Sequence, residues 1–328
     1  MYMNSLPSSL RIGVLRGGPS LEYDLSLRGG ARILQEFSET HRPIDIFISR
    51  DGKWHVQGVE RSPERILKNV DVVFNALHGA YGEDGQVQQL LNRVGVPYTG
   101  SDRFQSAVSK NKSMAKDIAR AAGIKTPISV VVRRSDSLSD KATEIWNSIP
   151  NPLVVKPVSG GSSLGVSVVE SYSELLSSLE DVLAENDSAL VEEYISGRQA
   201  TCGVVDSFRG QDVYVLPVIE MIVPKDKKFF DFDLKYSDRN EEICPGNFSI
   251  AEKKEIERSS KLIHTKLGLR HYSRSDFIVS PRRGVYFIEV NALPGLAEKS
   301  SLFLSLKSVG VSAKEFLHHV VALALDGK

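Results

Sequence analysis

The sequence predicts an α/β protein, and three observations support this class. In the first third of the 328-residue chain, apolar strands alternate with helical patterns, which indicates a parallel sheet. In the middle, two short strands flank a Gly/Ser loop, as in an antiparallel hairpin. Near the end, two apolar strands carry charged residues on one face. The length is enough for two or three separate cores.

Composition excludes several kinds of partner. The chain has 41 Lys and Arg against 41 Asp and Glu, which argues against nucleic-acid or anionic-membrane binding. No apolar run approaches the roughly 20 residues of a membrane span, and residues 1–10 do not resemble a secretory signal. Cys202 and Cys244 fit neither a disulfide framework nor a zinc site. We therefore expect a soluble, cytoplasmic protein.

The first segment, residues 1–101, contains two strands that are each followed by a glycine-containing loop and a helix. The expected strands are residues 11–15 and 70–77, and the expected helices are residues 24–37 and 86–94. Ligands of parallel sheets bind beyond the carboxyl ends of the strands, where Glu22 and His78 are expected. Helix capping would explain Glu22 equally well, and His78 could be structural.

The second segment, residues 102–188, has a lysine just before its Gly/Ser loop. We expect helices at 104–122 and 139–148 and strands at 128–133, 153–157 and 166–170. Lys156 lies near the end of the strand at 153–157, just before loop 158–165, whose glycines would let backbone N–H groups approach phosphate. The order differs from a P-loop, since the lysine precedes the glycines. A flexible hairpin turn remains an alternative.

The third segment, residues 189–328, contains a long polar loop. We expect strands at 189–195 and 213–223 and helices at 251–267 and 312–325. Loop 224–247 has the length of a lid, and its Lys235 and Tyr236 could face a substrate. An Ω-loop packed on its own side chains is the alternative. Glu192 and Glu193 end a strand and could present a carboxylate to a nucleotide, although a solvated strand end would look the same.

The strands at 271–279 and 287–291 predict a metal site. Residues 280–284 are short enough to make the two strands a hairpin. Arg274 and Asp276 share one strand face, and Glu289 and Asn291 share one face of the other. Asp276, Glu289 and Asn291 would form an oxygen cluster that suits Mg²⁺ together with substrate phosphates. Two solvated edge strands are the alternative.

Several motifs, taken together and in this order, resemble the ATP-grasp enzymes and, more narrowly, the D-alanine–D-alanine ligase family. The motifs are Gly17-Gly18-Pro19-Ser20-Leu21-Glu22, Leu77-His78-Gly79 with Gly82-Glu83-Asp84-Gly85, Pro97-Tyr98-Thr99-Gly100-Ser101, Lys156-Pro157 with Gly161-Ser162-Ser163-Leu164-Gly165, Lys235-Tyr236, Cys244-Pro245, and Glu289-Val290-Asn291 through Pro294-Gly295. The resemblance implies an N-terminal Rossmann-like parallel-sheet domain (1–101), a small central domain (102–188) and a C-terminal mixed-sheet domain (189–328) with a lid at 224–247.

The resemblance also implies a reaction and a site. ATP would phosphorylate one D-alanine, and the amine of a second would attack the acyl phosphate, giving the dipeptide of peptidoglycan precursors. The implied catalytic residues are Glu22, Ser162, Tyr236, Arg274 and Gly295, and the implied substrate-binding residues are His78, Lys235 and Ser300. The implied ATP-binding residues are Lys112, Lys156, Ser163, Glu192, Glu193 and Gln199. Asp276, Glu289 and Asn291 would hold two Mg²⁺ ions, which Mn²⁺ could replace. Homodimers are frequent in the family.

Two other functions stay open, and one is excluded. Gln199, Gly160, Ala297 and Glu298 depart from the family pattern, and the last two lie beside the expected second-substrate site. Ala297 and Glu298 favour an ATP-grasp ligase for a different D-amino acid or another carboxylate–amine pair. A nucleotide-binding regulator without chemistry is the second alternative, although an intact metal cluster argues against it. A Rossmann oxidoreductase is excluded, because no Gly-x-Gly-x-x-Gly follows the first strand.

Overall fold

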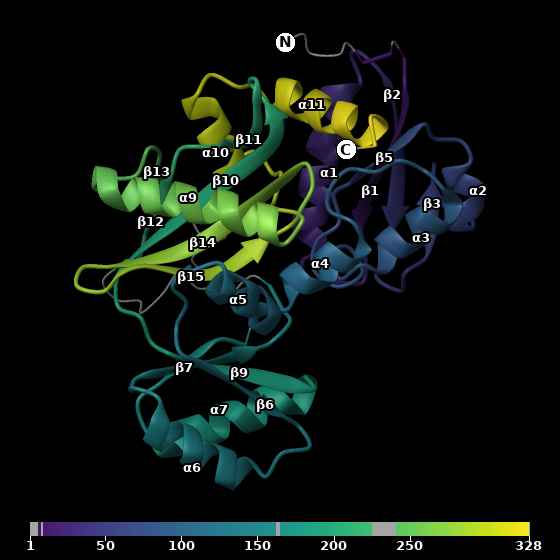
Figure 1. The fold of residues 1–328 in the computed structure, drawn as a ribbon. Coiled ribbons are helices and arrows are strands. Elements are labelled where there is room, and N and C mark those ends of the chain that lie inside the picture. Colours follow the sequence, from purple (N-terminus) through teal and green to yellow (C-terminus); the bar gives the residue numbers. More distant parts are fainter. Residues whose placement is uncertain (1–5, 8, 162–164, 225–240, 328) are drawn as a thin grey trace.

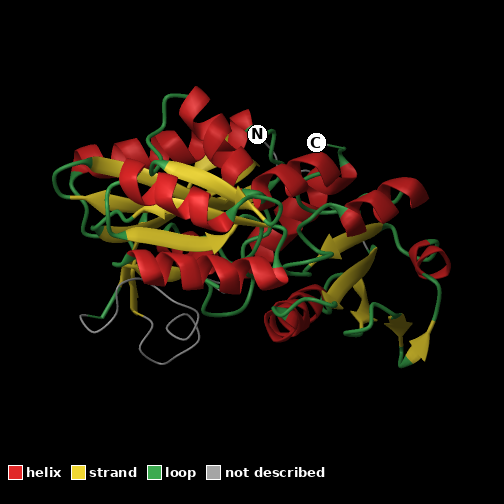
Figure 2. Cartoon of the chain, turned by 90° about the horizontal axis from the view of Figure 1, so that it is seen from below, coloured by secondary structure: helices red, strands yellow, loops and turns green. Residues whose placement is uncertain are grey.

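The computed structural model describes residues 6–7, 9–161, 165–224 and 241–327, which form three β-sheets with helices packed against them. Figure 1 shows that the four-stranded sheet and its two helices make a separate lobe below the other two sheets. Seen from below, helices lie against the strands throughout the molecule (Figure 2). Among the described helices, none is long and apolar enough to cross a membrane.

The N-terminal sheet confirms the predicted parallel core and adds an antiparallel edge. Its strand order is β4-β3-β2-β1-β5, and β1 is parallel to both β2 and β5. The strands are β1 (Arg11–Gly17), β2 (Arg42–Ile48), β3 (Trp54–Val56), β4 (Val59–Glu60) and β5 (Val72–Asn75). The helices are α1 (Tyr23–Phe37), α2 (Pro63–Leu67) and α3 (Gln86–Val94). The short strands β3 and β4 pair antiparallel at one edge and were not predicted.

Alternating apolar side chains bury both faces of this sheet. Ile12 and Val14 of β1 join a core with α1 and with two C-terminal helices, α10 (Ser301–Ser308) and α11 (Ala313–Leu325). Leu15 joins a second core that includes Val87 and Leu91 of α3. The alternation is the pattern of a strand with covered faces on both sides. The first of these cores also includes residues of the six-stranded sheet described next, so it joins the N-terminal sheet to that sheet.

The large sheet has strand order β13-β12-β10-β14-β15, with β11 also paired to β10, and its described pairs are antiparallel. The strands are β10 (Arg198–Phe208), β11 (Gln211–Val215), β12 (Ile219–Ile222), β13 (Glu241–Ile243), β14 (Tyr272–Ser280) and β15 (Gly284–Asn291). The single strand expected at 213–223 is wrong. The chain leaves the sheet at Pro217, which lacks the N–H that a central strand needs, and β11 and β12 pair with different parts of β10.

The single helix expected at 104–122 is also wrong. The structure has α4 (Arg103–Lys110) and α5 (Lys112–Ala121), separated by Asn111 in an extended conformation. The Asn111 side chain accepts a hydrogen bond from the Met114 N–H and so caps α5. Both helices pack with α9 (Ile250–Lys266) in the core of the large sheet, rather than on the central sheet. Because of this break, Lys110 and Lys112 reach different partners: Lys110 contacts Glu83, and Lys112 contacts Gly160.

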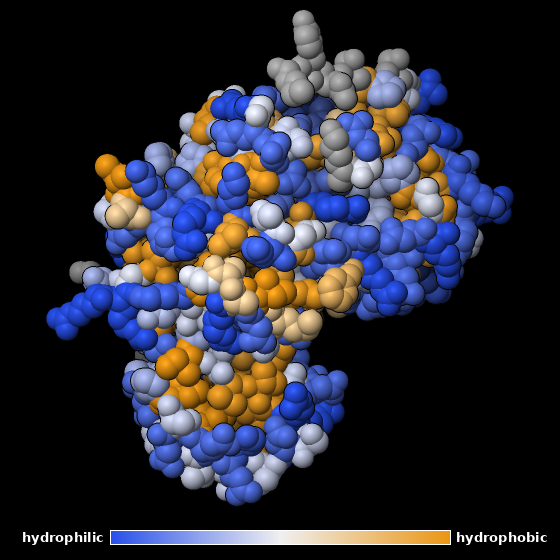
Figure 3. Space-filling model, viewed as in Figure 1, coloured by the Kyte–Doolittle hydropathy of each residue, from blue (hydrophilic) through white to orange (hydrophobic). Residues whose placement is uncertain are grey.

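The central sheet has strand order β6-β9-β7-β8, and all three pairs are antiparallel. Its elements are β6 (Ser129–Arg133), α6 (Leu138–Ser148), β7 (Leu153–Pro157), β8 (Ser167–Val169), α7 (Tyr172–Glu185) and β9 (Ser188–Glu193). The β7–β8 hairpin is as predicted, whereas β9 was expected to start the third segment and instead lies between β6 and β7. In Figure 3, apolar residues gather on this lobe, while most of the surface in view is hydrophilic.

Candidate active site

A cleft lies between the central sheet and the large sheet. Val154 and Val168 line it from the central sheet, and Met221, Ile278 and Ile288 line it from the large sheet. The connection from β9 to β10 adds Tyr194 and Ile195, and Gln199 of β10 lies in the same wall. Aliphatic walls with a few polar groups at one end suit a flat aromatic base that carries a charged tail.

Three buried charges lie at the wall of this cleft. Glu192 of β9 contacts the ammonium groups of Lys116 at 2.9 Å and of Lys156 at 2.6 Å, and the three side chains are at most 6% exposed. Burial alone would raise the pKa of Glu192, but the two lysines hold it below its ordinary value. Burial lowers the pKa of Lys116 to about 8. Sequence reasoning missed Lys116, although its spacing of four from Lys112 places both on one helix face.

Lys112 connects this cleft to the C-terminal hairpin. Its ammonium donates to the Gly160 carbonyl at 2.8 Å and lies 3.3 Å from a Glu289 carboxylate oxygen. Burial lowers the pKa of Lys112, and Glu289 partly offsets this effect. Lys112 begins α5, and Gly160 belongs to the predicted Gly/Ser loop. Lys112, the Gly/Ser loop and the acidic cluster therefore meet at one place.

The C-terminal hairpin brings the predicted cluster together, with help from a β-bulge. Asp276 lies opposite Glu289, and Arg274 lies opposite Asn291. The register shifts so that Phe277 pairs with Phe287 and no partner faces Ile288. Phe287 is buried in the core, whereas Glu289, two residues later, lines the cleft. In a regular strand these two side chains would share a face, so the bulge turns Glu289 toward the cleft.

Arg274 and Asp276 form a bidentate ion pair, with nitrogen–oxygen distances of 3.0 and 2.9 Å. The Thr201 hydroxyl donates to Asp276 at 2.6 Å. Burial would lower the pKa of Arg274, but Asp276 raises it above its ordinary value, so the guanidinium stays charged. The network orients the carboxylate beside Glu289.

The donor set fits a hard cation that binds together with a substrate. Asp276, Glu289 and Asn291 offer oxygen ligands on one face of the hairpin. Within the described ranges, no group of three or more His, Cys, Asp or Glu side chains gathers as a self-sufficient metal site. Mg²⁺ is commonly held by one or two carboxylates while substrate phosphate oxygens and waters complete its shell. The hairpin thus fits a metal–phosphate complex better than a bare ion.

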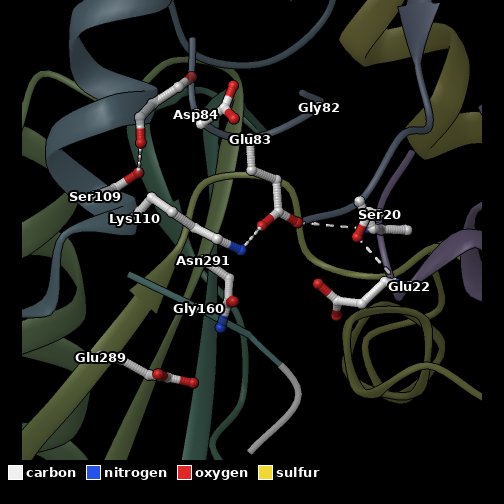
Figure 4. A network of polar contacts seen from close by, with 12 residues as sticks. Ser20, Glu22, Gly82, Glu83, Asp84, Ser109, Lys110, Gly160, Glu289 and Asn291 are labelled. Atoms are coloured by element: carbon white, nitrogen blue, oxygen red, sulfur yellow. Dashed lines mark hydrogen bonds and ion pairs between the residues drawn. The ribbon is translucent and has the colours of Figure 1, made fainter. Parts of the chain in front are cut away.

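A second small pocket adjoins the hairpin. Its lining includes Glu83, Lys110, Lys112, Glu289 and Asn291. Figure 4 shows Lys110 pointing to Glu83, with Glu22 on the far side and Asn291 and Glu289 nearby. The His78 Nδ1 lies 3.3 Å from the second Glu83 oxygen. The pocket is small and lined by both signs of charge, as a zwitterionic ligand requires.

Glycines allow the loops to approach Glu22. A Cβ on Gly161 would lie 2.8 Å from Glu22 Oε2, so the Gly/Ser loop passes close to this carboxylate. Gly79 has a φ of +69°, and a Cβ there would overlap the Ser20 hydroxyl and lie 2.9 Å from Glu22. Larger residues at either position would displace Glu22.

The remaining predicted residues fall into two groups. Glu193 lines the cleft between the sheets and is held by Arg283 at 2.7 Å, Gly295 follows the hairpin near Leu25, and Ser300 caps α10. Glu298, which departs from the family pattern, is exposed. Ser162, Ser163, Lys235 and Tyr236 lie outside the described residues, as does most of the predicted lid.

Comparisons with known proteins identify the family. The model "D-ala D-ala ligase C-terminus" matches residues 118–322, and "D-ala D-ala ligase N-terminus" matches residues 58–101. The D-alanine--D-alanine ligase of Aquifex aeolicus is 36% identical over 95% of this chain and 100% of the relative. That of Geobacter sulfurreducens is 35% identical over 96% of this chain and 94% of the relative.

Solved structures share the fold. VanG D-Ala:D-Ser ligase from Enterococcus faecalis superimposes with a TM-score of 0.82 at 28% identity, covering 96% of this chain and 99% of that one. D-alanyl-alanine synthetase A from Vibrio cholerae has a TM-score of 0.85 at 25% identity, covering 98% and 99%. Two sheets around an apolar cleft, with these likenesses, define an ATP-grasp enzyme. The chain belongs to the D-alanine–D-alanine ligase family, whose members are ATP-dependent ligases.

Proposed function

We propose that the protein joins two D-alanines into D-alanyl-D-alanine through an acyl phosphate, with ATP as co-substrate. The observation that carries this proposal is the contact of Lys112 with both Gly160 and Glu289. This contact brings the Gly/Ser loop, a buried lysine and the hairpin carboxylates to one point, which supports phosphate binding there. That point lies between an apolar cleft for the base and a charged pocket for an amino acid. Phosphoryl transfer depends mainly on such positioning and charge neutralisation.

ATP would bind in the cleft between the sheets. Lys112 and Lys156 would hold its phosphates, and Ser163 would add a donor from the loop. Glu193 and Gln199 line the same cleft and would contact the base and ribose. Glu192 is held by two buried lysines, so we assign it a supporting role: it keeps Lys156 oriented toward the phosphates.

Two Mg²⁺ ions, or Mn²⁺ in their place, would be held by Asp276, Glu289 and Asn291. When bound, such ions neutralise phosphate charge. Arg274 supports this cluster through Asp276 and, with the Gly295 N–H, would stabilise the negative tetrahedral intermediate. The Thr201 hydroxyl keeps Asp276 in place.

The two amino acids would lie on the other side of the phosphates. Glu22 would bind the ammonium of the first D-alanine, with His78 nearby, and Lys235 and Ser300 would bind the carboxylate of the second. Ser162 and Tyr236 would join Glu22 in latching loop 224–247 over the site, which would exclude water from the acyl phosphate. These assignments rest on the family motifs and on the approach of the Gly/Ser loop to Glu22.

A different second substrate is the alternative. The exposed Glu298 lies close in sequence to Ser300, where a second substrate carboxylate would bind. A solved relative with the same fold is named as a D-Ala:D-Ser ligase, which supports a D-amino acid other than D-alanine as the second substrate.

For the main proposal, the product would enter peptidoglycan synthesis in the cytoplasm and thereby support cell shape. A homodimer is part of the proposal on family grounds.

Phosphate release from MgATP tests the proposal. We expect release with D-alanine alone, together with D-alanyl-D-alanine detected by mass spectrometry. L-alanine would be the matched control, because it has the same charges and mass with inverted geometry. Release only with a mixed pair, such as D-alanine and D-serine, would move the second substrate. No release with any D-amino acid, despite ATP binding, would contradict the proposal and favour a regulatory role.

A further inference from the structure

Lys110 is a half-buried cation to which the proposed reaction assigns no role. It ends α4, its side chain is 15% exposed, and its ammonium forms an ion pair with Glu83. Because Asn111 is extended, Lys110 and Lys112 leave the chain in different directions. Lys112 lies beside Glu289, whereas Lys110 points to Glu83 (Figure 4), and both lysines line the second small pocket.

The Lys110 ammonium lies beside the carboxylate proposed to bind the first ammonium group. A Cβ built on Gly161 would be 3.3 Å from Lys110 Nζ and 2.8 Å from Glu22 Oε2, so both groups border the same point. An ion pair with Glu83 holds the Lys110 ammonium in place, and Glu83 is itself held by His78. The ammonium therefore stands between Glu22 and the hairpin carboxylates.

This arrangement complements an amino-acid zwitterion. An α-amino acid carries its ammonium and its carboxylate on the same α-carbon, so a site for it needs an anion and a cation side by side. Glu22 supplies the anion and Lys110 the cation. Resting on the proposed function, we propose that Lys110 binds the carboxyl group of the first amino acid and keeps it in place as it becomes an acyl phosphate.

The chemistry of the step requires no bond to Lys110. A carboxylate oxygen forms a bond to the γ-phosphorus of ATP, the bond to the bridging oxygen breaks, and ADP leaves with the electron pair. The amine of the second substrate then adds to the acyl carbon, loses a proton, and displaces inorganic phosphate. In both steps Lys110 would offset negative charge on the reacting carboxyl group.

The surroundings keep Lys110 protonated. Burial alone would lower its pKa, but Glu83, Glu22 and Glu289 raise it above its ordinary value. Burial likewise opposes the charge on Glu83, yet Lys110 and His78 lower the pKa of that carboxyl to about 2. Lys110 is therefore a cation and Glu83 an anion at neutral pH.

Lys110→Met tests the inference, because it removes the charge and keeps much of the volume. The assay traps the acyl phosphate with hydroxylamine, so it reports the first half-reaction and the first D-alanine alone. We expect the D-alanine KM to rise by about ten- to a hundred-fold, the worth of a charge-assisted hydrogen bond, with the MgATP KM changed less than about two-fold. The matched control is Lys314→Met. Lys314 lies on α11 and forms an exposed ion pair with Glu39, so this change should alter neither KM. Lys110→Arg should recover part of the loss.

A merely structural role for Lys110 predicts different results. If Lys110 served only to hold Glu83, Lys110→Met would have no further effect in a Glu83→Gln background, whereas binding of the carboxyl group predicts that most of the effect persists. A D-alanine KM unchanged by Lys110→Met, in an active wild type, overturns this inference alone. A wild type that traps no D-alanyl hydroxamate overturns the proposed function as well. Lys110→Gln carries the same test if the methionine variant does not fold.

Discussion

The buried charges around Glu192 allow a sharp prediction about Glu192→Gln. The carboxylate lies 2.9 Å from Lys116 and 2.6 Å from Lys156, and none of the three side chains is more than 6% exposed. The substitution keeps the shape but leaves two buried ammonium groups without their counter-charge. Removing one partner of a buried ion pair costs about 3–5 kcal/mol. That is a large part of a typical domain stability of about 5–15 kcal/mol.

Urea unfolding at pH 7 would measure this loss, with Glu39→Gln as the matched control. Glu39 makes an ion pair of similar length with Lys314, at 2.8 Å, but its side chain is 74% exposed. We expect the control to leave the unfolding midpoint unchanged, since exposed pairs contribute little. The MgATP KM of Glu192→Gln should also rise, because Lys156 loses its anchor. A loss of stability below about 1 kcal/mol would refute the reasoning, since it would mean that water screens the pair as it does at the surface.

Three further predictions concern single residues. The folded-state pKa of Lys116 is about 8 against an ordinary 10.5, so between these values the unfolded chain binds the extra proton and stability should rise with pH. The free energy of unfolding should rise by up to about 3 kcal/mol across this range. Denaturant titrations at pH 8 and pH 10 would measure the rise, which Lys116→Met should lack. Gly79→Ala, at a φ of +69°, should cost about 1–3 kcal/mol in thermal unfolding and raise the D-alanine KM by displacing Glu22. Glu289→Gln should lower phosphate release by roughly 100-fold or more with the fold intact by circular dichroism, and wild-type activity would remove Glu289 from the metal-binding set.

Local patterns in the sequence were enough for the elements that carry their own signals. The helix expected at 86–94 matches α3, because its apolar residues repeat with helical spacing and glycines stand at both ends. The hairpin β14–β15 was predicted from two apolar runs and a short linker, and it brings Arg274, Asp276 and Asn291 together as expected. The family motifs predicted roles for residues that are far apart along the chain.

Elements defined by distant contacts could not be predicted in this way. Strand β9 has the apolar pattern of any buried strand, and only its pairing with β6 and β7 assigns it to the central sheet. The break at Asn111 interrupts a continuous helical pattern, because the Asn111 side chain caps a new helix. The free-energy difference between a capped break and a continuous helix is small. The packing of the two helices therefore decides between them.

The same distinction holds for the active site. The sequence by itself determined the family, the acidic hairpin and the lysine before the Gly/Ser loop, because these depend on residue type and short spacing. Only the tertiary structure decided that Lys116 is buried under Glu192, that Lys110 faces Glu83, and that a bulge turns Glu289 into the cleft. These contacts join parts of the chain that no periodicity relates, since buried charges find partners through packing in three dimensions rather than along the sequence.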